Sequence, residues 1–465
     1  MHVKSLLLTL PCKNTLKKYT GNLVTEDGVN SLIKERLVHE VSSLDNGGDK
    51  FASIIIDEMA IQPKCLYDKP SDTVFGFSSD DKDKKVLANR LLCFVIHGLS
   101  INYSIPCAYY FTKNLAGKKL YSLFLSVLKE VEECGFIIVR VVTDNHKTNV
   151  LFFKKLSKSK QMQHKIEHPL DENRPMFLSF DPSHLIKNIR NQFLDREMSG
   201  KENYITGNFV KKLYEMQEDQ IVKPVRFLTR KHVYPNNLEK MNVLRAVQVF
   251  SAPVIATIQF FRENCSAHPQ AHLFREAGDT LHYMTNMKKW FEIHDVGNRT
   301  LGFHSKNANK EHFFSITGER LQWLETEFPS YMKDVEEESL QSGKYFLTPE
   351  TYSALLLTSL STTACVRYLL ESGFHYVLTR KLSSDPVESL FSAVRQMNGG
   401  NDASDAKAST IAINKILRTG LLLPHHSSNG ESLSSKMLLK TIPKPNLPSP
   451  KEIPGDGMDI LEEAG

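Results

Sequence analysis

The nine residues FIIVRVVTD, at positions 136–144, are the part of this 465-residue sequence that decides its predicted fold. β-Branched apolar residues dominate the stretch, which is typical of a central strand covered on both faces. The preceding stretch, 118–134, has leucine and valine at helical spacing, and the following stretch, 148–156, is also helix-like. A helix that leads into a buried strand and then into another helix predicts an α/β sheet, at whose edge Asp144 meets solvent.

The stretch FASIIIDEM, at positions 51–59, has the same pattern and presents Asp57. Four short apolar runs follow it and predict antiparallel strands, at 64–67, 73–77, 91–97 and 106–111. A third acid, Glu388, lies in SDPVE, residues 384–388. Asp385 as a cap and Pro386 at the first helical position predict that a helix begins there.

Asp57, Asp144 and Glu388 have the chemistry of a divalent-cation site. Mg²⁺ prefers oxygen ligands and keeps several of its waters, so one or two carboxylates per ion suffice. Two such ions activate an attacking oxygen and stabilise the leaving oxygen in phosphoryl transfer. An acid at a strand end is also typical of a helix cap or a turn, so the spacing of the acids leaves both interpretations open.

The composition describes a globular protein with enough residues for two or three domains, since 41% of the residues are hydrophobic and 24% are charged. No uninterrupted apolar stretch reaches the roughly 18–20 residues of a membrane span, so no membrane partner is expected. The seven cysteines are scattered and form no C-x₂-C pair, which argues against a disulfide framework and a zinc module. A net charge of +5 permits a nucleic-acid partner without identifying one.

The order of these patterns divides the chain into five parts. Residues 1–45 read as a helical N-terminal segment and 46–195 as the first part of the α/β core. From 196 to 378 the pattern is mainly helical, with no second alternation of strands and helices, which predicts an insertion domain. Residues 379–425 return to the core with the third acid, and residues 426–465 are polar and rich in proline, which predicts a disordered tail.

Four blocks of the sequence, taken together and in order, resemble the P element transposase family. They are DEMAI at 57–61, Asp144-Asn145 with Asn149, FDPSHLIKNIRN at 180–191, and SDPVESLF at 384–391. The resemblance extends over roughly residues 10–420. It implies an RNase H-like DDE transposase core interrupted by a large, mainly helical insertion that binds GTP. It also implies that Asp57, Asp144 and Glu388 are the catalytic residues and the ligands of Mg²⁺ or Mn²⁺.

The activity that this resemblance implies is metal-dependent cleavage of DNA ends followed by strand transfer, in the nucleus and in a homo-oligomer. The stretch FEIHD, residues 291–295, stands where the family shows F-D-x-x-N. Phe291, Glu292 and Asp295 are therefore the implied contacts to a guanine nucleotide, together with Asp385. Glutamate replaces aspartate in this stretch, and aspartate replaces asparagine. The second exchange removes an amide donor and adds a negative charge near the phosphates.

Basic residues near the acids are candidates for contacts to DNA. Four of them lie in the acid-free stretch 145–166: Lys147, Lys154, Lys155 and Lys158. They fit contacts to phosphates, although a solvated helix face has the same pattern. His184, Lys187 and Arg190 lie at positions i, i+3 and i+6 of one predicted helix, which fits either the lining of the metal site or pairing with neighbouring acids.

Two other functions fit the same residues. A catalytically inactive remnant of a transposase, which binds DNA or protein, would keep the fold without the chemistry. This sequence lacks the C2CH zinc ligands of the family's THAP-type finger, which favours the remnant and predicts weak site-specific DNA recognition. A nuclease of the RNase H type that acts on RNA would share the metal site, but it would not explain the helical insertion.

Overall fold

The structure is a computed structural model that describes Cys12 and residues 26–44, 46–69, 71–79, 85–266, 268–400 and 404–419. The predicted tail, 426–465, and most of the predicted N-terminal segment, 1–45, lie outside these residues. From that segment the structure describes α2 (Ser31–Ser42), which buries Ile33 and Leu37. The described residues from 26 to 419 belong to one compact unit, so the domain boundaries proposed within it stay predictions.

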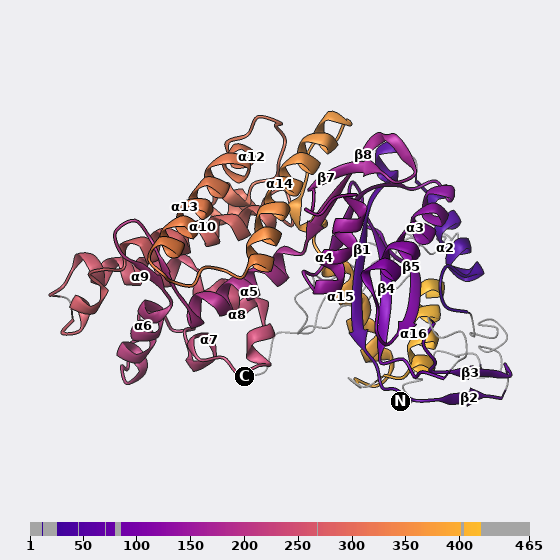
Figure 1. Cartoon of the computed structure of the whole chain (residues 1–465), viewed down its shortest axis with the longest axis horizontal. Coiled ribbons are helices and arrows are strands. Elements are labelled where there is room, and N and C mark those ends of the chain that lie inside the picture. Colours follow the sequence, from indigo (N-terminus) through magenta and orange to yellow (C-terminus); the bar gives the residue numbers. More distant parts are fainter. Residues whose placement is uncertain are drawn as a thin grey trace, which may run out of the picture. The chain divides into compact units, whose positions relative to one another are not determined.

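A six-stranded sheet forms the core, in the order β5–β4–β1–β6–β8–β7 (Figure 1). Strand β4 pairs antiparallel with β1 and β5, β6 pairs parallel with β1 and β8, and β7 pairs antiparallel with β8. The strands are β1 (Phe51–Ala60), β4 (Arg90–Gly98), β5 (Ser104–Thr112), β6 (Ile137–Thr143), β7 (Lys165–His168) and β8 (Asp171–Phe180). The strands β2 (Leu66–Asp68) and β3 (Thr73–Phe75) form a separate hairpin. The strands predicted between 51 and 111 and at 136–144 are thus confirmed, whereas β7 and β8 were not predicted.

Helices α3 (Gly117–Glu133) and α4 (Lys147–Leu156) flank β6 in the sequence and pack against each other. The buried face of α3 carries Leu120, Phe124, Val127, Leu128 and Val131. The two helices approach closely at Gly117, where an added Cβ would lie 2.8 Å from the Cβ of Leu151. A larger residue there would push the helices apart, so this approach depends on glycine. Both helices agree with their predicted ranges within about a residue.

Helices that follow β8 return to the sheet. α5 (Pro182–Asp195) begins directly after β8, α14 (Pro349–Glu371) packs on β8, and α15 (Asp385–Met397) packs against β1 and β4. α16 (Ala406–Thr419) packs on β5 and α2.

The buried Arg140 of β6 connects the sheet to α14. It donates to Ser179 Oγ at 2.7 Å, to Thr362 Oγ1 at 3.2 Å and to Ser361 Oγ at 3.3 Å. A buried guanidinium needs hydrogen-bond partners, and two of these partners belong to α14. The bonds therefore fix this helix to the sheet.

The region between α5 and α14 is mainly helical, as the pattern at 196–378 predicts (Figure 1). A short hairpin of β9 (Glu197–Ser199) and β10 (Tyr204–Thr206) opens it. Its helices are α6 (Asn208–Glu218), α7 (Arg230–Val233), α8 (Val243–Val249), α9 (Ala252–Glu263), α10 (Gly278–His294), α11 (Leu301–Ser305), α12 (Glu319–Gln322) and α13 (Phe328–Gln341).

Among the residues that the structure describes, two helical stretches are long and apolar enough to cross a membrane by length and composition alone: Val243–Glu263 in this region and Pro349–Glu371 directly after it. The second is α14, most of which is buried inside the protein, as in the core helix of a globular domain. The first is divided into α8 and α9 near Ser251. Composition of this kind is weak evidence, so the expectation of no membrane partner stays a prediction.

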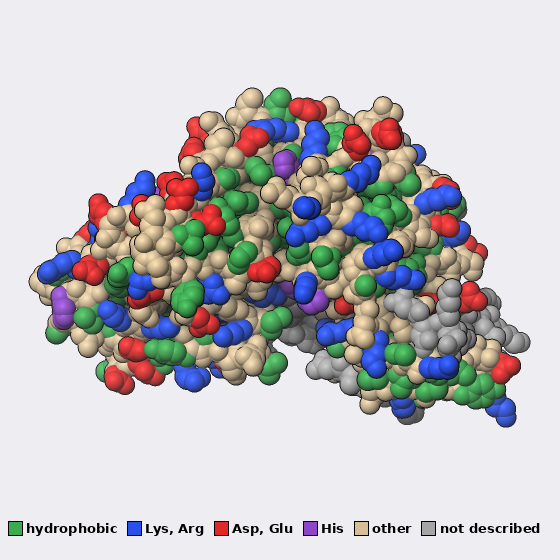
Figure 2. All heavy atoms as spheres, viewed as in Figure 1, with side chains coloured by type: hydrophobic (Ala, Val, Ile, Leu, Met, Phe, Trp, Pro, Cys, Tyr) green, Lys and Arg blue, Asp and Glu red, His purple; other side chains and the backbone are tan. Residues whose placement is uncertain are grey.

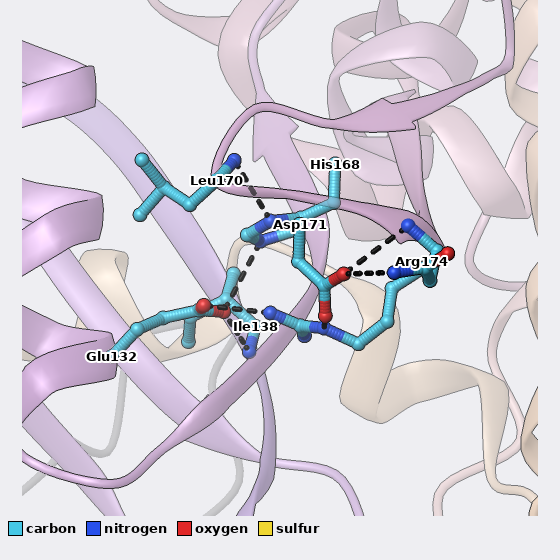
Figure 3. A network of polar contacts seen from close by, with 7 residues as sticks. Glu132, Ile138, His168, Leu170, Asp171 and Arg174 are labelled. Carbon is cyan, nitrogen blue, oxygen red and sulfur yellow. Dashed lines mark hydrogen bonds and ion pairs between the residues drawn. The ribbon is translucent and has the colours of Figure 1, made fainter.

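A polar network ties the turn between β7 and β8 to the core (Figure 3). Glu132, near the end of α3, accepts a hydrogen bond from the backbone N–H of Ile138 at 3.0 Å and another from Arg174 at 2.6 Å. Arg174 also donates to Asp171 at 2.8 Å, and His168 Nε2 lies 3.1 Å from Glu132 Oε1. The network holds the start of β8 beside β6, so the two strands end at the same edge of the sheet.

Candidate active site

Asp57 and Asp144 lie side by side where two parallel strands stop pairing. In the register of β1 and β6, Ile56 pairs with Thr143, so the next residue of each strand is one of the two acids. Ligand sites of α/β sheets are found at the carboxyl ends of their parallel strands. The two acids, predicted from separate stretches of sequence, therefore belong to one site.

Local hydrogen bonds hold one oxygen of each of these carboxylates. Asp144 Oδ1 accepts from Asn149 Nδ2 at 2.6 Å and from the backbone N–H of His146 at 3.0 Å. Asp57 Oδ1 accepts from the backbone N–H of Glu58 at 2.8 Å. Within the described part of the chain, neither Oδ2 has a hydrogen-bond partner. Each acid therefore keeps one oxygen that a ligand can use.

Glu388 comes to the site from the first turn of α15, as predicted. Its Oε1 lies 3.4 Å from Nε2 of His184, in the first turn of α5. The fully buried Asp181 holds both helices, because its Oδ2 accepts from the backbone N–H of His184 and its Oδ1 from that of Ser384, each at 2.8 Å. Asp181 is the N-cap of α5, and no local pattern of the sequence indicates its second bond, to the start of α15.

The charged groups of the site act on one another. The pKa of Asp57 is raised to about 7, chiefly by burial; the charges of Asp144 and Glu388 add to the rise, and the charge of His184 opposes it. Burial also acts to raise the pKa of Glu388, but the hydrogen bond and charge of His184, together with the charges of Lys187 and Arg395, outweigh it and lower this pKa below its ordinary value. The three acids are thus close enough to repel one another, and His184 offsets part of their charge.

The chemistry of these donors fits a hard divalent cation, because all three are carboxylates and Asp57 and Asp144 each keep an oxygen free. A cation beside acids that repel one another favours their charged forms and would lower the pKa of Asp57. Among the residues that the structure describes, no three His, Cys, Asp or Glu side chains are already arranged as a metal site. The acids converge, then, without forming a closed set of ligands.

The four lysines predicted to contact DNA lie on or next to α4. Lys147, Lys155 and Lys158 are exposed, and Lys154 is partly exposed. Figure 2 shows Lys and Arg side chains gathered on the part of the face where Figure 1 places α4, whereas acidic and basic side chains are mixed over the helical insertion. The ammonium of Lys155 lies 4.7 Å from the centre of the Tyr121 ring. These lysines are accessible to phosphates, and their role stays a prediction.

The three candidates on α5 differ in what surrounds them. His184 contacts Glu388, and Lys187 is 7% exposed and contributes to the lowered pKa of Glu388. Arg190 is fully buried and donates to the backbone carbonyls of Lys240 at 3.1 Å and Glu239 at 3.5 Å. The guanidinium of Arg190 is thus enclosed and bound to backbone carbonyls, and its role as a contact to DNA stays a prediction.

The four residues implied as guanine-nucleotide contacts gather around two cavities of about 200 Å³ each. Phe291 and Asp295 line both cavities, Asp385 lines the first, and Glu292 lines the second. Asp385 is the first residue of α15 rather than its cap, which is Ser384.

Side chains of the protein already bind the acids at these cavities. Glu292 accepts from Lys288, Asn307 and Asn309. Arg380 Nε lies 3.0 Å from Asp385 Oδ2 and 3.5 Å from Asp295 Oδ1. Burial raises the pKa of Asp385 to about 7, and the charge of Arg380 opposes this rise. Arg380 was not predicted as a site residue, and no local pattern of the sequence marks it.

A larger cavity, of about 580 Å³, lies away from both groups of acids. Its lining includes Lys158, Lys165 and Arg174, but also Glu167 and Glu172. It lies beside the start of β8, at the opposite end of that strand from Asp181. Its mixed charges do not indicate a ligand.

The sheet with acids at the ends of β1 and β6, interrupted by a helical region before α15, defines an RNase H-like domain with an insertion. Family models agree with this architecture. Residues 25–157 match the TNP-like, RNase H N-terminal domain, and residues 183–308 match the TNP-like, GTP-binding insertion domain. The chain belongs to the family of P element-like transposases, as its four sequence blocks predict.

Two curated relatives and one solved structure are similar to most of this chain. It is 21% identical over 396 residues to the Transposable element P transposase of Drosophila melanogaster and 22% identical over 409 residues to the DNA transposase THAP9 of Homo sapiens. Each match covers 84% of this chain, and 48% and 43% of the relatives, so the chain spans about half their length. The Drosophila P element transposase strand transfer complex matches with a TM-score of 0.70 at 19% identity, over 89% of this chain and 86% of that chain. This likeness confirms the predicted fold.

Proposed function

We propose that this chain cuts DNA ends and joins them to target DNA, with Asp57, Asp144 and Glu388 as its catalytic residues. The observation that carries the proposal is the register that sets Asp57 beside Asp144, with Glu388 close enough to raise the pKa of Asp57. The solved relative is a strand transfer complex, which supports DNA as the substrate.

Mg²⁺ or Mn²⁺ would be held by these three acids and would supply an activated oxygen nucleophile and a stabilised leaving oxygen. The chain's own residues do the rest of the work. Asn149 and His146 orient Asp144, and His184 orients Glu388. The accessible lysines around α4 bind the phosphates of the DNA backbone, which gives affinity that depends on salt rather than on sequence.

The proposal extends to the setting of the reaction. DNA as substrate places the chain in the nucleus, and joining of paired ends calls for a homo-oligomer. Both are inferences from the function and the relatives rather than from the fold.

The test is strand transfer by the purified chain, with a DNA duplex that carries a free 3′-OH and a plasmid as target. We expect joined products with Mg²⁺ or Mn²⁺ and none with EDTA. Glu388→Gln should lower the joining rate by a factor on the order of 10³ while its melting temperature stays near that of the parent. Asp334→Asn, an exposed acid on α13, serves as the control that keeps activity.

Two arms separate the other functions. An RNA–DNA hybrid offered as substrate identifies a nuclease of the RNase H type if it is cleaved in preference to DNA. Binding of Mn²⁺ measured by magnetic resonance, together with no cleavage and no joining, would contradict the proposal and identify an inactive remnant.

A further inference from the structure

Glu292 has no acceptor site left for a ligand. A carboxylate offers about four lone-pair sites on its two oxygens. Lys288 Nζ lies 3.0 Å from Oε1 and 3.1 Å from Oε2, Asn307 donates to Oε1 at 2.9 Å, and Asn309 donates to Oε2 at 3.1 Å. Glu292 is 9% exposed, so water is largely excluded from these bonds. The edge of a base would have to displace one of the protein's own donors.

Asp295 and Asp385 share the guanidinium of Arg380. The two acids belong to different parts of the protein: Asp295 is the C-cap of α10, and Asp385 is the first residue of α15, the helix that carries Glu388. Arginine–carboxylate bonds are about twice as strong as bonds between neutral groups. The guanidinium therefore joins the insertion to a helix of the active site.

Thr379 and the backbone of Arg380 also bind the end of α10. Thr379 Oγ1 donates to the carbonyl of Ile293 at 2.6 Å, and the backbone N–H of Val296 donates to Thr379 Oγ1 at 3.3 Å. The backbone N–H of Arg380 donates to the carbonyl of Val296 at 3.2 Å. The end of α10 is thus bound to residues 379–380 by three further bonds, before any ligand is present.

The charge around Phe291 does not suit a nucleoside triphosphate. The two cavities there, each of about 200 Å³, share Phe291 and Asp295 in their linings. The first cavity has one cation, Arg380, and two acids, Asp295 and Asp385. The second has two cations, Lys288 and Lys310, and two acids, Glu292 and Asp295. A ligand with several negative charges needs a surplus of cations, and this lining has none.

We propose that Arg380 and Lys288 act as built-in cations at the place where the family's insertion domain is described as GTP-binding, so that this chain holds its insertion on α15 without a guanine nucleotide. The inference concerns the insertion and stands apart from the catalytic proposal. It predicts a rigid junction between α10 and α15 in the nucleotide-free protein.

The test uses the whole chain at pH 8, without DNA, so its outcome does not depend on catalysis. The parent should show no saturable binding of a fluorescent GTP analogue with Mg²⁺ up to about 1 mM, and GTP should not raise its melting temperature. Arg380→Ala should melt about 3–6 °C lower. Guanidinium ion at about 10 mM, far below denaturing concentrations, should recover part of this loss, because it can enter the space that the side chain leaves.

Arg367→Ala is the matched control. Arg367 lies on α14 and binds Glu325 at 2.9 and 2.7 Å and the carbonyl of Ile316 at 3.1 Å, and within the described part of the chain it makes no bond to α10 or α15. Its variant should show no recovery with guanidinium. Should Arg380→Ala fail to fold, Arg380→Lys takes its place, because lysine keeps the charge without the planar guanidinium. Arg380→Lys should melt at a lower temperature than the parent, and it should not bind the analogue.

Two results would overturn the inference. One is saturable binding of the GTP analogue by the parent with a Kd below about 100 µM, accompanied by a higher melting temperature. The other is a melting temperature of Arg380→Ala, or of Arg380→Lys in its place, equal to that of the parent. Absence of strand transfer by the parent would contradict the catalytic proposal. It would not affect the two tests of this inference, which are binding of the GTP analogue and the melting temperatures.

Discussion

Asp57 and Asp385 have the same raised pKa, about 7, and burial is the main cause in both, yet their surroundings differ in kind. Asp385 has a guanidinium of its own chain 3.0 Å away. Asp57 faces two further acids and has the partial compensation of His184. The comparison teaches that burial alone does not mark a cation site. What marks it is buried negative charge that the protein's own cations leave in excess.

The largest expected effect concerns the group of acids around Asp57, which we propose to bind a metal ion. Asp144→Asn keeps the size of the side chain but removes charge and a metal-binding oxygen, so strand transfer should fall by a factor on the order of 10³. Asp295→Asn removes charge from the compensated group and should keep most of the joining rate. Equal losses in the two variants, measured as rates of joined product with Mg²⁺, would break the comparison.

Removal of a compensated acid should cost stability instead. Glu292→Ala leaves the Lys288 ammonium and two amides without their acceptor in a nearly buried place. We expect the free energy of unfolding to fall by about 3 kcal/mol. Urea denaturation measures this change, and Glu337→Ala, which removes an exposed partner of Lys333, should lower it by less than about 1 kcal/mol. A loss for Glu292→Ala as small as that of the control would show that its four bonds contribute little.

Asp57→Asn should stabilise the metal-free protein. In the folded state the pKa of Asp57 lies above its ordinary value of 3.8. Between about pH 4 and pH 7 the folded state therefore keeps a proton on Asp57 that the unfolded state has lost. The free energy of unfolding therefore falls as pH rises through this window. We expect Asp57→Asn to gain on the order of 2 kcal/mol at pH 8 with EDTA and nothing at pH 4.

Asp385→Asn sharpens the same measurement. The pKa of Asp385 is also raised to about 7, so at pH 8 a neutral side chain is favoured there too. The substitution also takes the charged partner from Arg380, so Asp385→Asn should raise the melting temperature less than Asp57→Asn does. Thermal unfolding of the two variants, side by side in EDTA, gives the two shifts. Equal stabilisation by both substitutions would mean that Arg380 does not compensate its acid.

The smallest expected effect concerns lysines of α4 that have no acidic partner among the residues that the structure describes. Lys154→Ala and Lys155→Ala should each weaken DNA binding equally for all sequences, and each should lower the slope of log affinity against log salt by about 1. Fluorescence anisotropy over a salt series measures the slope. Lys333→Ala, on α13, should leave it unchanged. An unchanged slope for the α4 variants would assign these lysines to a solvated helix face.

The parts of the fold that were predicted correctly have patterns that are complete within one stretch of sequence. β1, β6 and α3 each show their period in their own residues, so local reasoning is enough for them. β8 begins with the polar residues DENR and a proline, and its place in the sheet depends on β7, β6 and the network around Glu132. Local pattern does not contain this information.

The candidate site divides in the same way. The acids at strand ends could be predicted because strand and acid are neighbours in the sequence. The spacing of His184, Lys187 and Arg190 indicates which side of α5 they share, but it cannot say that backbone near Lys240 covers Arg190. The contact of Arg380 with Asp295 and the second bond of Asp181 join distant segments, and only the tertiary fold brings these together.

The two bonds of Asp181 have a consequence for the order in which the protein is made. Ser384 lies 203 residues after Asp181, so a growing chain that has completed β1, β6 and β8 contains two of the three proposed catalytic acids, and Asp181 has formed only one of its two bonds. The third acid arrives only after the insertion has been synthesised and its ends have returned to the same place. Closing so long a loop costs little more than closing a short one, since the entropy grows only with the logarithm of length. Synthesis thus delays assembly of the candidate site until the insertion is complete, and an unfinished chain lacks one of its three acids.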